Sequence, residues 1–167
     1  VFQIAYGGRM RRKQQRAKFQ KEWGTIPKRE YSYEELEKIS RYFYYNLQKN
    51  RIQEPFIDDI TWNDLNMNEI FKRIFAYANH AKSSPGEEYL YYLLRTPAAN
   101  QKVLDERERL MQFFSSHEKE RLELELCFAE IGKTRKFAIS DYVDLLLTLE
   151  KENNIWHYLA IATIPAG

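Results

Sequence analysis

Residues 83–97 read SSPGEEYLYYLLRTP, and this stretch decides the fold because it carries the strongest helix start signal in the chain. Ser84 suits the N-cap, Pro85 the first helical position and Glu87 the third. The helix is expected to end near Arg95, because a proline two residues later disfavours helical backbone at the residue that precedes it.

The same stretch predicts how this helix packs. Gly86 leaves the first turn without a Cβ and would permit the close approach of another helix. Leu90, Leu93 and Leu94 recur at helical spacing and are expected to bury against the following helix. Pro97 forces a reversal of the chain, so the helices before and after it should be antiparallel neighbours.

Helical signals continue on both sides of this stretch. Ser32 and Glu35 form a capping box ahead of apolar residues at helical spacing. The other predicted N-caps are Asn66, Asn100, Ser116 and Ser140, and the predicted helix stop is Gly132. Residues 56–62 are expected to form an extended connection, and a last apolar helix should begin near residue 153.

The sequence therefore predicts an all-α fold. We expect about six or seven helices in an antiparallel, bundle-like domain over residues 31–167, preceded by a loosely attached basic arm over residues 1–30. The length of 167 residues suits one compact core, and a composition that is 44% hydrophobic excludes general disorder. The aromatic clusters at 42–45 and 89–92 are expected to pack in this core rather than to stack on bases.

The charge of the chain is unevenly distributed. Residues 9–29 contain nine Lys and Arg side chains and one acid, although the net charge of the whole chain is only +2. Three uses of this segment stay open: binding to a polyanion with release of counterions, attraction to anionic lipid headgroups, or a solvated linker. The residues expected to contact phosphate or headgroups are Arg11, Arg12, Lys13, Arg16, Lys18 and Lys21.

Signals of catalysis are weak. Residues 131–134 (IGKT) are similar to the tail of a phosphate-binding P-loop, but that motif needs a glycine where this chain has Cys127. A helix end followed by basic residues is therefore preferred, and the single cysteine is expected to be a buried, inert thiol. Asp58 and Asp59 are expected in a loop or cap role. The three histidines lie far apart in the sequence, so no catalytic or metal-binding residue is assigned.

The two ends of the chain carry a further expectation. It begins at Val1 and ends at Gly167 inside an apolar stretch, so we expect both ends to lie within a longer protein. The run at 155–166 is shorter than the roughly 20 apolar residues that span a bilayer. It is either the last helix of the domain or the first turns of a membrane segment.

Residues 58–110 resemble a known family. The quoted elements are Asp64-Leu65-Asn66-Met67, Ile70-Phe71, the stretch at 83–97, and Val103-Leu104 followed by Arg107 and Leu110. Together they look like the start of the core (lever) domain of the MutS family of DNA mismatch repair proteins. The positions that match the family motif are Ser84, Gly86, Leu90, Leu94, Pro97 and Arg107.

The resemblance implies a non-catalytic helical domain that joins a DNA-clamping region to a C-terminal ATPase. DNA would be its partner, and the ATPase of the parent protein, with ATP and Mg²⁺, would lie beyond Gly167 and could form a homodimer. A cytoplasmic location is implied, with membrane association of the parent suggested by the basic arm and the apolar end. The chain has no room for the family's mismatch-reading N-terminal domain, which puts mismatch specificity in doubt.

Two functions are therefore weighed. The first is a helical core domain of a MutS-related DNA-binding ATPase that couples nucleotide-driven movement to DNA contact. The alternative is a structural or scaffold helical module of a membrane-associated protein that makes no contact with DNA.

Overall fold

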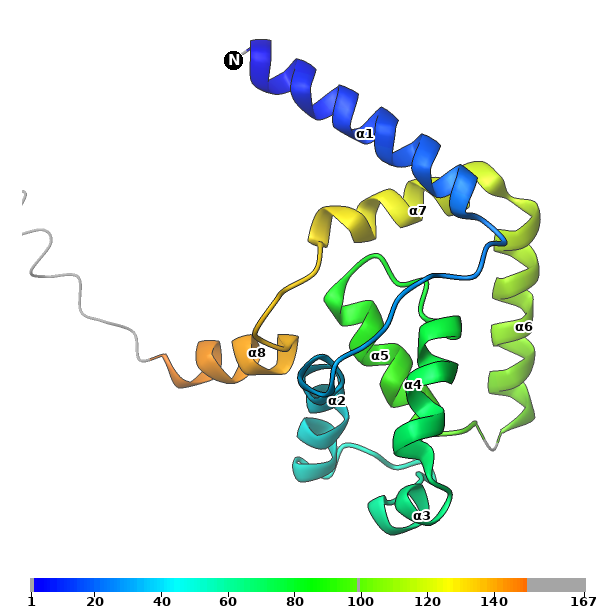
Figure 1. The fold of residues 1–167 in the computed structure, drawn as a ribbon, viewed down its shortest axis with the longest axis vertical. Coiled ribbons are helices and arrows are strands. Elements are labelled where there is room, and N and C mark those ends of the chain that lie inside the picture. Colours follow the sequence, from blue (N-terminus) through cyan, green and yellow to red (C-terminus); the bar gives the residue numbers. More distant parts are fainter. Residues whose placement is uncertain (1, 99, 150–167) are drawn as a thin grey trace, which may run out of the picture.

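The computed structural model describes residues 2–98 and 100–149, and in these residues it contains eight helices and no strand (Figure 1). The predicted all-α class is confirmed. The helices are α1 (Phe2–Glu22), α2 (Tyr33–Gln48), α3 (Asp59–Asp64), α4 (Met67–Ala78), α5 (Ser84–Arg95), α6 (Gln101–Ser116), α7 (Glu118–Ile131) and α8 (Ile139–Thr148). The last apolar helix, expected near residue 153, lies outside the described residues.

The main core is aromatic and lies between α2, α3, α4 and α5. Phe43 of α2 and Phe75 of α4 are fully buried, and Trp62 and Tyr91 are nearly so. The rings of Phe71 and Phe75 stack with their centroids 5.2 Å apart. The prediction that the aromatic clusters pack in the core is confirmed for Phe43 and Tyr91.

Several helix boundaries follow from side-chain caps that the sequence predicts. The capping box at Ser32 is present, because its hydroxyl accepts from the Glu35 N–H while the Glu35 carboxylate accepts from the Ser32 N–H. Asn100 caps α6, and Gly132 ends α7 with a φ of 75°, which a glycine adopts without strain. Asp58 takes the predicted cap role by accepting from the Thr61 N–H.

Other predicted boundaries are wrong. The cap of α5 is Ser83 and not Ser84, whose hydroxyl is used in a tertiary contact described below. Ser116 is the last residue of α6, since its hydroxyl returns to carbonyls of its own helix. Ser140 lies inside α8, which begins after Ala138. Asn66 precedes α4 in a left-handed conformation (φ 51°) and makes no side-chain cap.

The segment 56–62, predicted as an extended connection, contains the first four residues of the short helix α3 (Asp59–Asp64). Its formation follows from the Asp58 cap at one end and from the burial of Trp62 against Phe71 and Tyr91. With this helix, the described residues from 31 onward hold seven helices, α2 to α8, which agrees with the six or seven expected there; α1 lies in the segment predicted as an arm.

The predicted packing of α5 against α6 is also wrong. α5 packs mainly on α2, and α6 packs on α7, so Pro97 does not create an antiparallel pair. Leu90 and Leu94 contact the aromatic core instead of the following helix. Figure 1 shows α6 at the edge of the molecule, on the far side of α4 from α5.

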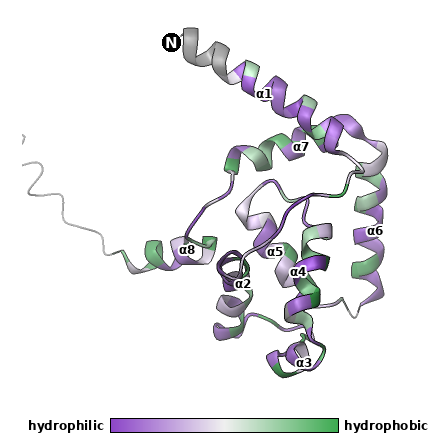
Figure 2. Cartoon of the chain, in the orientation of Figure 1, coloured by the Kyte–Doolittle hydropathy of each residue, from purple (hydrophilic) through white to green (hydrophobic). Residues whose placement is uncertain are grey.

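A second, smaller cluster joins α1 to α7. Phe19 of α1 is buried against Leu122 and Leu126 of α7. Figures 1 and 2 show the C-terminal end of α1 beside α7. The basic segment is thus a helix with a packed C-terminal half rather than a loosely attached arm. Cys127 lies on the exposed side of α7, so the expectation of a buried thiol is wrong.

None of the helices within residues 2–98 and 100–149 is both long and apolar enough to cross a membrane.

We expect Phe43→Ala to lower the free energy of unfolding by about 3–5 kcal/mol, because it leaves a cavity in the centre of the aromatic core. Urea denaturation followed by circular dichroism measures this change. Tyr77→Ala is the matched control, since Tyr77 is 61% exposed on α4 and its loss should change stability by less than about 0.5 kcal/mol. Equal losses in the two variants would contradict this assignment of the core.

Candidate functional site

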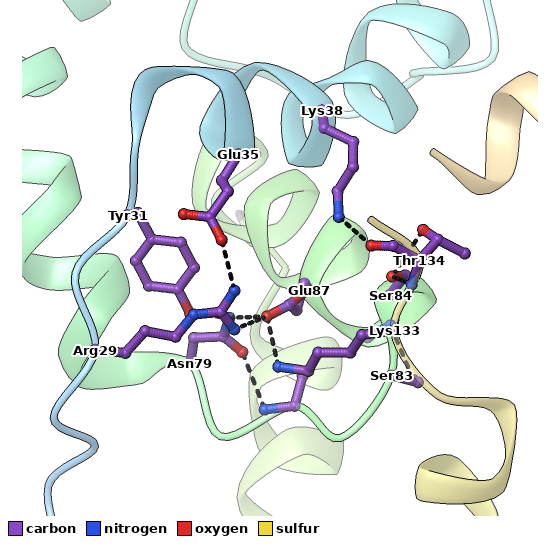
Figure 3. A network of polar contacts seen from close by, with 12 residues as sticks. Arg29, Tyr31, Glu35, Lys38, Asn79, Ser83, Ser84, Glu87, Lys133 and Thr134 are labelled. Atoms are coloured by element: carbon purple, nitrogen blue, oxygen red, sulfur yellow. Dashed lines mark hydrogen bonds and ion pairs between the residues drawn. The ribbon is translucent and has the colours of Figure 1, made fainter. Parts of the chain in front are cut away.

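Glu87 lies at the centre of a buried polar network at the start of α5 (Figure 3). Its side chain is 1% exposed, and Oε1 accepts from Arg29 at 2.9 Å, Asn79 at 2.9 Å and Lys133 at 2.7 Å. Arg29 also donates to Glu35 at 3.0 Å. One carboxylate therefore holds together the segment before α2, the loop before α5 and the segment after α7.

Ser84 holds the segment after α7 by main-chain and side-chain contacts. Its N–H donates to the carbonyl of Gly132 at 3.0 Å, and its hydroxyl accepts from the Thr134 N–H at 2.8 Å. Lys38 of α2 donates to the Thr134 carbonyl at 2.7 Å. We call Ser84, Glu87 and their neighbour Glu88 the polar hub.

Glu88 is the third member of the polar hub and connects it to α8. Its carboxylate is 1% exposed and accepts from the Ile139 N–H, at the first residue of α8, at 3.0 and 3.2 Å. Burial raises the pKa of this carboxyl to about 7, although the bond from Ile139 and the charge of Lys38 act in the opposite direction. Asp141 and Glu87 face it as like charges and raise its pKa further.

Gly86 is required by the loop that precedes α5 and not by a neighbouring helix. A Cβ at this position would lie 3.0 Å from the Ala81 Cβ and 3.3 Å from the Ser83 hydroxyl. The expectation of a close helix–helix contact at Gly86 is therefore wrong. The glycine allows the loop to fold back on the first turn, which places Asn79 beside Glu87.

Arg95 anchors the other end of α5. Its guanidinium is buried, donates to Asp59 at 2.6 Å and lies 4.5 Å from the ring centroids of both Phe43 and Trp62. This hydrogen bond from Arg95 lowers the pKa of Asp59. Asp59, at the start of α3, therefore has a structural role as the ion-pair partner of Arg95.

The basic residues of α1 divide into two sets. Arg12 and Arg16 pair with Glu123 of α7, the first at 2.9 Å, and Gln20 donates to Glu118 at 3.0 Å. These contacts lie on the same side of the helix as Phe19 and hold α1 on α7.

The second set takes no part in these contacts. Arg11, Lys13 and Lys21 are exposed, and Lys18 is paired only within its own helix, to Glu22 at 3.7 Å, among the residues that the structure describes. Exposed pairs of this kind contribute little to stability. Four of the six predicted contact residues are therefore available to an anionic partner, and two serve the docking of α1.

Lys82 connects the α1–α7 pair to the main core. Its ammonium lies 3.5 Å from Glu22, 3.8 Å from Glu125 and 4.3 Å from the centre of the Phe19 ring. Burial raises the pKa of Glu125, and the charge of Lys82 opposes that shift.

The remaining candidates have structural surroundings. In the P-loop-like tail, Lys133 is bound to Glu87 and Thr134 to Ser84. Arg107 lies half-buried on α6, and Pro97 is exposed between α5 and α6. In residues 2–98 and 100–149, no three or more His, Cys, Asp or Glu residues are placed to hold a metal ion.

Sequence reasoning missed Arg29, Glu87 and Lys133 as a unit. The sequence pattern places Glu87 in the first turn of a helix, where a negative charge complements the helix dipole, but it does not indicate that the side chain is buried. One feature of the sequence could have indicated this network: the pair Glu87 and Glu88, which directly precedes the apolar residues of α5. Such a pair does not specify which residues bind to it.

No protein-family model, curated protein or solved structure matches this chain. Its function is therefore inferred from the geometry of its own residues.

The raised pKa of Glu88 predicts a dependence of stability on pH. Its carboxyl binds protons more tightly in the folded chain than in the unfolded chain, so its contribution to stability is lost as pH rises from about 4.5 through about 7. Glu88→Gln removes this titration but keeps an oxygen that can accept from Ile139. We expect the stability of the variant relative to the wild type to increase by up to about 3 kcal/mol over this interval. Urea unfolding at several pH values measures it, and a constant difference would contradict the assignment.

The small α1–α7 cluster predicts that Phe19→Ala releases α1. Amide hydrogen exchange in residues 9–22 should accelerate at least tenfold, which corresponds to a loss of about 1.4 kcal/mol, while exchange in α5 stays unchanged. Gln14→Ala is the control, because Gln14 is exposed on α1. Unchanged exchange in Phe19→Ala would show that ion pairs alone hold the helix.

Proposed function

We propose that this chain is a helical core segment of a MutS-related DNA-binding ATPase, non-catalytic in itself. In this role it binds DNA through the charges of α1 and transmits movement that ATP and Mg²⁺ drive elsewhere in the parent protein. The parent would act in the cytoplasm in mismatch repair or a related DNA transaction, and its ATPase would provide a homodimer contact. The observation that carries the proposal is a set of four exposed cations, Arg11, Lys13, Lys18 and Lys21, on a helix that is itself packed on α7.

The sequence resemblance supports the family part of this proposal. The motif residues Ser84 and Gly86 have defined tasks at the start of α5, and Leu90 and Leu94 contact the core. Each of these contacts depends on the type of residue at its position, as is expected of residues in a recurring structural motif.

A continuous series of polar contacts supports the transmission part. It begins at α8, where Ile139 binds Glu88, and passes along α5 to Glu87 and Arg29 in the segment that follows α1. Lys82 adds a second connection to Glu22 at the end of α1. Contacts of this kind can bias two elements together when one of them is displaced.

The electrostatics of α1 predict the salt dependence of DNA binding. Arg11, Lys13, Lys18 and Lys21 changed together to Gln should reduce the slope of log affinity against log salt by roughly 1.4–3.6, since each lost phosphate contact removes about 0.7–0.9 and two to four of these side chains contact the DNA. Fluorescence anisotropy with a labelled DNA oligonucleotide measures the slope. The double variant Arg12→Gln/Arg16→Gln tests the docking of α1 on α7 separately from DNA binding. Its expected effect is faster amide exchange in α1. An unchanged slope in the fourfold variant would reject DNA contact by α1.

One observation favours the alternative, a scaffold module of a membrane-associated protein. Leu145, Leu146, Leu147 and Leu149 are each more than half exposed near the end of α8. Figure 2 shows hydrophobic residues at this end of the helix. Such a module would float with anionic vesicles and would not shift a DNA oligonucleotide. Flotation and gel shift on one sample decide between the two functions.

A further inference from the structure

A continuous groove runs along one side of α1. Two hollows, of about 490 and 600 Å³, lie end to end, since Gln15 and Ala129 line both of them. The first lies between the first half of α1 and the end of α7. The second continues past the end of α1 to the loop that precedes α5. We call this surface the α1 groove.

Basic side chains reach the α1 groove from both walls. Arg11 and Lys18 come from α1 and Lys28 from the segment that follows it, while Lys82 and Lys133 come from the opposite wall. The acidic side chains of the lining are Glu22 and Glu130. Glu22 is engaged by Lys82 at 3.5 Å, and Glu130 lies 3.9 Å from Arg12. An extended chain of negative charges therefore meets cations along the whole length of the groove.

The groove leads into a third hollow of about 500 Å³ that has an aromatic wall. Phe19 and Glu22 line both this hollow and the groove, whereas Trp23 lines the hollow but not the groove. Trp23 is 50% exposed, and the guanidinium of Arg121 lies 3.6 Å from the centre of its ring. A half-exposed indole backed by a cation offers a platform for a flat aromatic group.

We infer that the α1 groove binds a single nucleic-acid strand, with phosphates against Arg11, Lys18 and Lys28 and a base stacked at Trp23. The inference rests on the proposed function and specifies the form and the path of its nucleic acid. A duplex keeps its bases stacked inside and offers none to Trp23, whereas a single strand has free base faces.

The shape of the site favours a strand over a membrane. A helix turns by about 100° per residue, so Lys13 and Lys21 point roughly 120–160° away from Gln15 in the groove. A flat bilayer would meet that convex side first. A thin, flexible polyanion can enter between α1 and the opposite wall and reach the cations there.

Only some of the cations that line the α1 groove can be replaced without disturbing the fold. Arg29, Lys82 and Lys133 bind carboxylates of the body, so their removal would disturb the fold. Arg11 and Lys28 are exposed, and Lys18 makes only its contact within α1. The test variant is therefore Arg11→Gln/Lys18→Gln/Lys28→Gln. Its matched control removes three exposed cations far from the groove, Lys49→Gln/Arg73→Gln/Lys102→Gln.

The experiment measures binding of the 167-residue chain to a labelled oligothymidylate by anisotropy over a range of salt concentrations. The groove variant should lose at least tenfold in affinity, and its salt slope should fall by roughly 2. The remote variant has the same net charge and should keep the wild-type slope. A duplex should bind more weakly than the single strand.

Trp23 supplies an independent readout of the stacked base. Trp23→Leu should weaken binding roughly 5- to 150-fold with an unchanged salt slope, and Trp23→Phe should restore most of the loss. Circular dichroism and α1 amide exchange on both variants verify that the helix stays docked.

The outcomes separate the two proposals. Equal losses in the groove and remote variants, or tighter binding to phosphatidylserine vesicles than to DNA at the same salt, would overturn the groove as a nucleic-acid site. DNA binding that is equally strong for duplex and single strand and insensitive to Trp23→Leu would overturn it as well, and would leave the proposed function standing. Absence of any DNA binding by the wild-type chain at low salt would instead reject the proposed function itself.

Discussion

Burial of the Glu87 carboxylate without cations would cost several kcal/mol, and the arrangement of the surrounding segments follows from the need to avoid that cost. Arg29, Asn79 and Lys133 come from three different parts of the chain, and each donates to the same oxygen. The segment before α2, the loop before α5 and the segment after α7 must therefore converge on the first turn of α5. The aromatic core explains how α2, α4 and α5 pack, but it does not explain why these connections lie where they do.

Two apolar clusters of unequal size are joined by polar contacts. The aromatic cluster fixes the body, whereas the α1–α7 cluster contains only Phe19, Leu122 and Leu126 as buried apolar side chains among the described residues. Less buried apolar area means a lower free energy of local opening, so α1 belongs to the less stable end of the molecule. α8 is attached in a similar way, by Glu88 to Ile139 and by Arg41 to Asp141.

The features that sequence predicted well are those that local physics determines. The caps at Ser32, Asp58 and Asn100 need only neighbouring backbone N–H groups, and their patterns identify them. Helix partners are not local, and α5 packs on α2 because the aromatic rings of both helices complete one core. The division of the basic residues of α1 could not be predicted, because it depends on Glu123, more than one hundred residues away.

α8 and the segment that follows α1 both bind the first turn of α5, which bears directly on the proposed transmission of movement. Apolar contacts are non-directional and allow neighbouring helices to slide, whereas a buried carboxylate with fixed donors tolerates little displacement before a charge is left unpaired. A displacement of α8 would therefore act on Glu88, and through the first turn of α5 on Glu87 and Arg29, before it disturbed the aromatic core. α5 carries the buried carboxylates and the elements that bind them lie around it, which is the arrangement that the proposed relay would require.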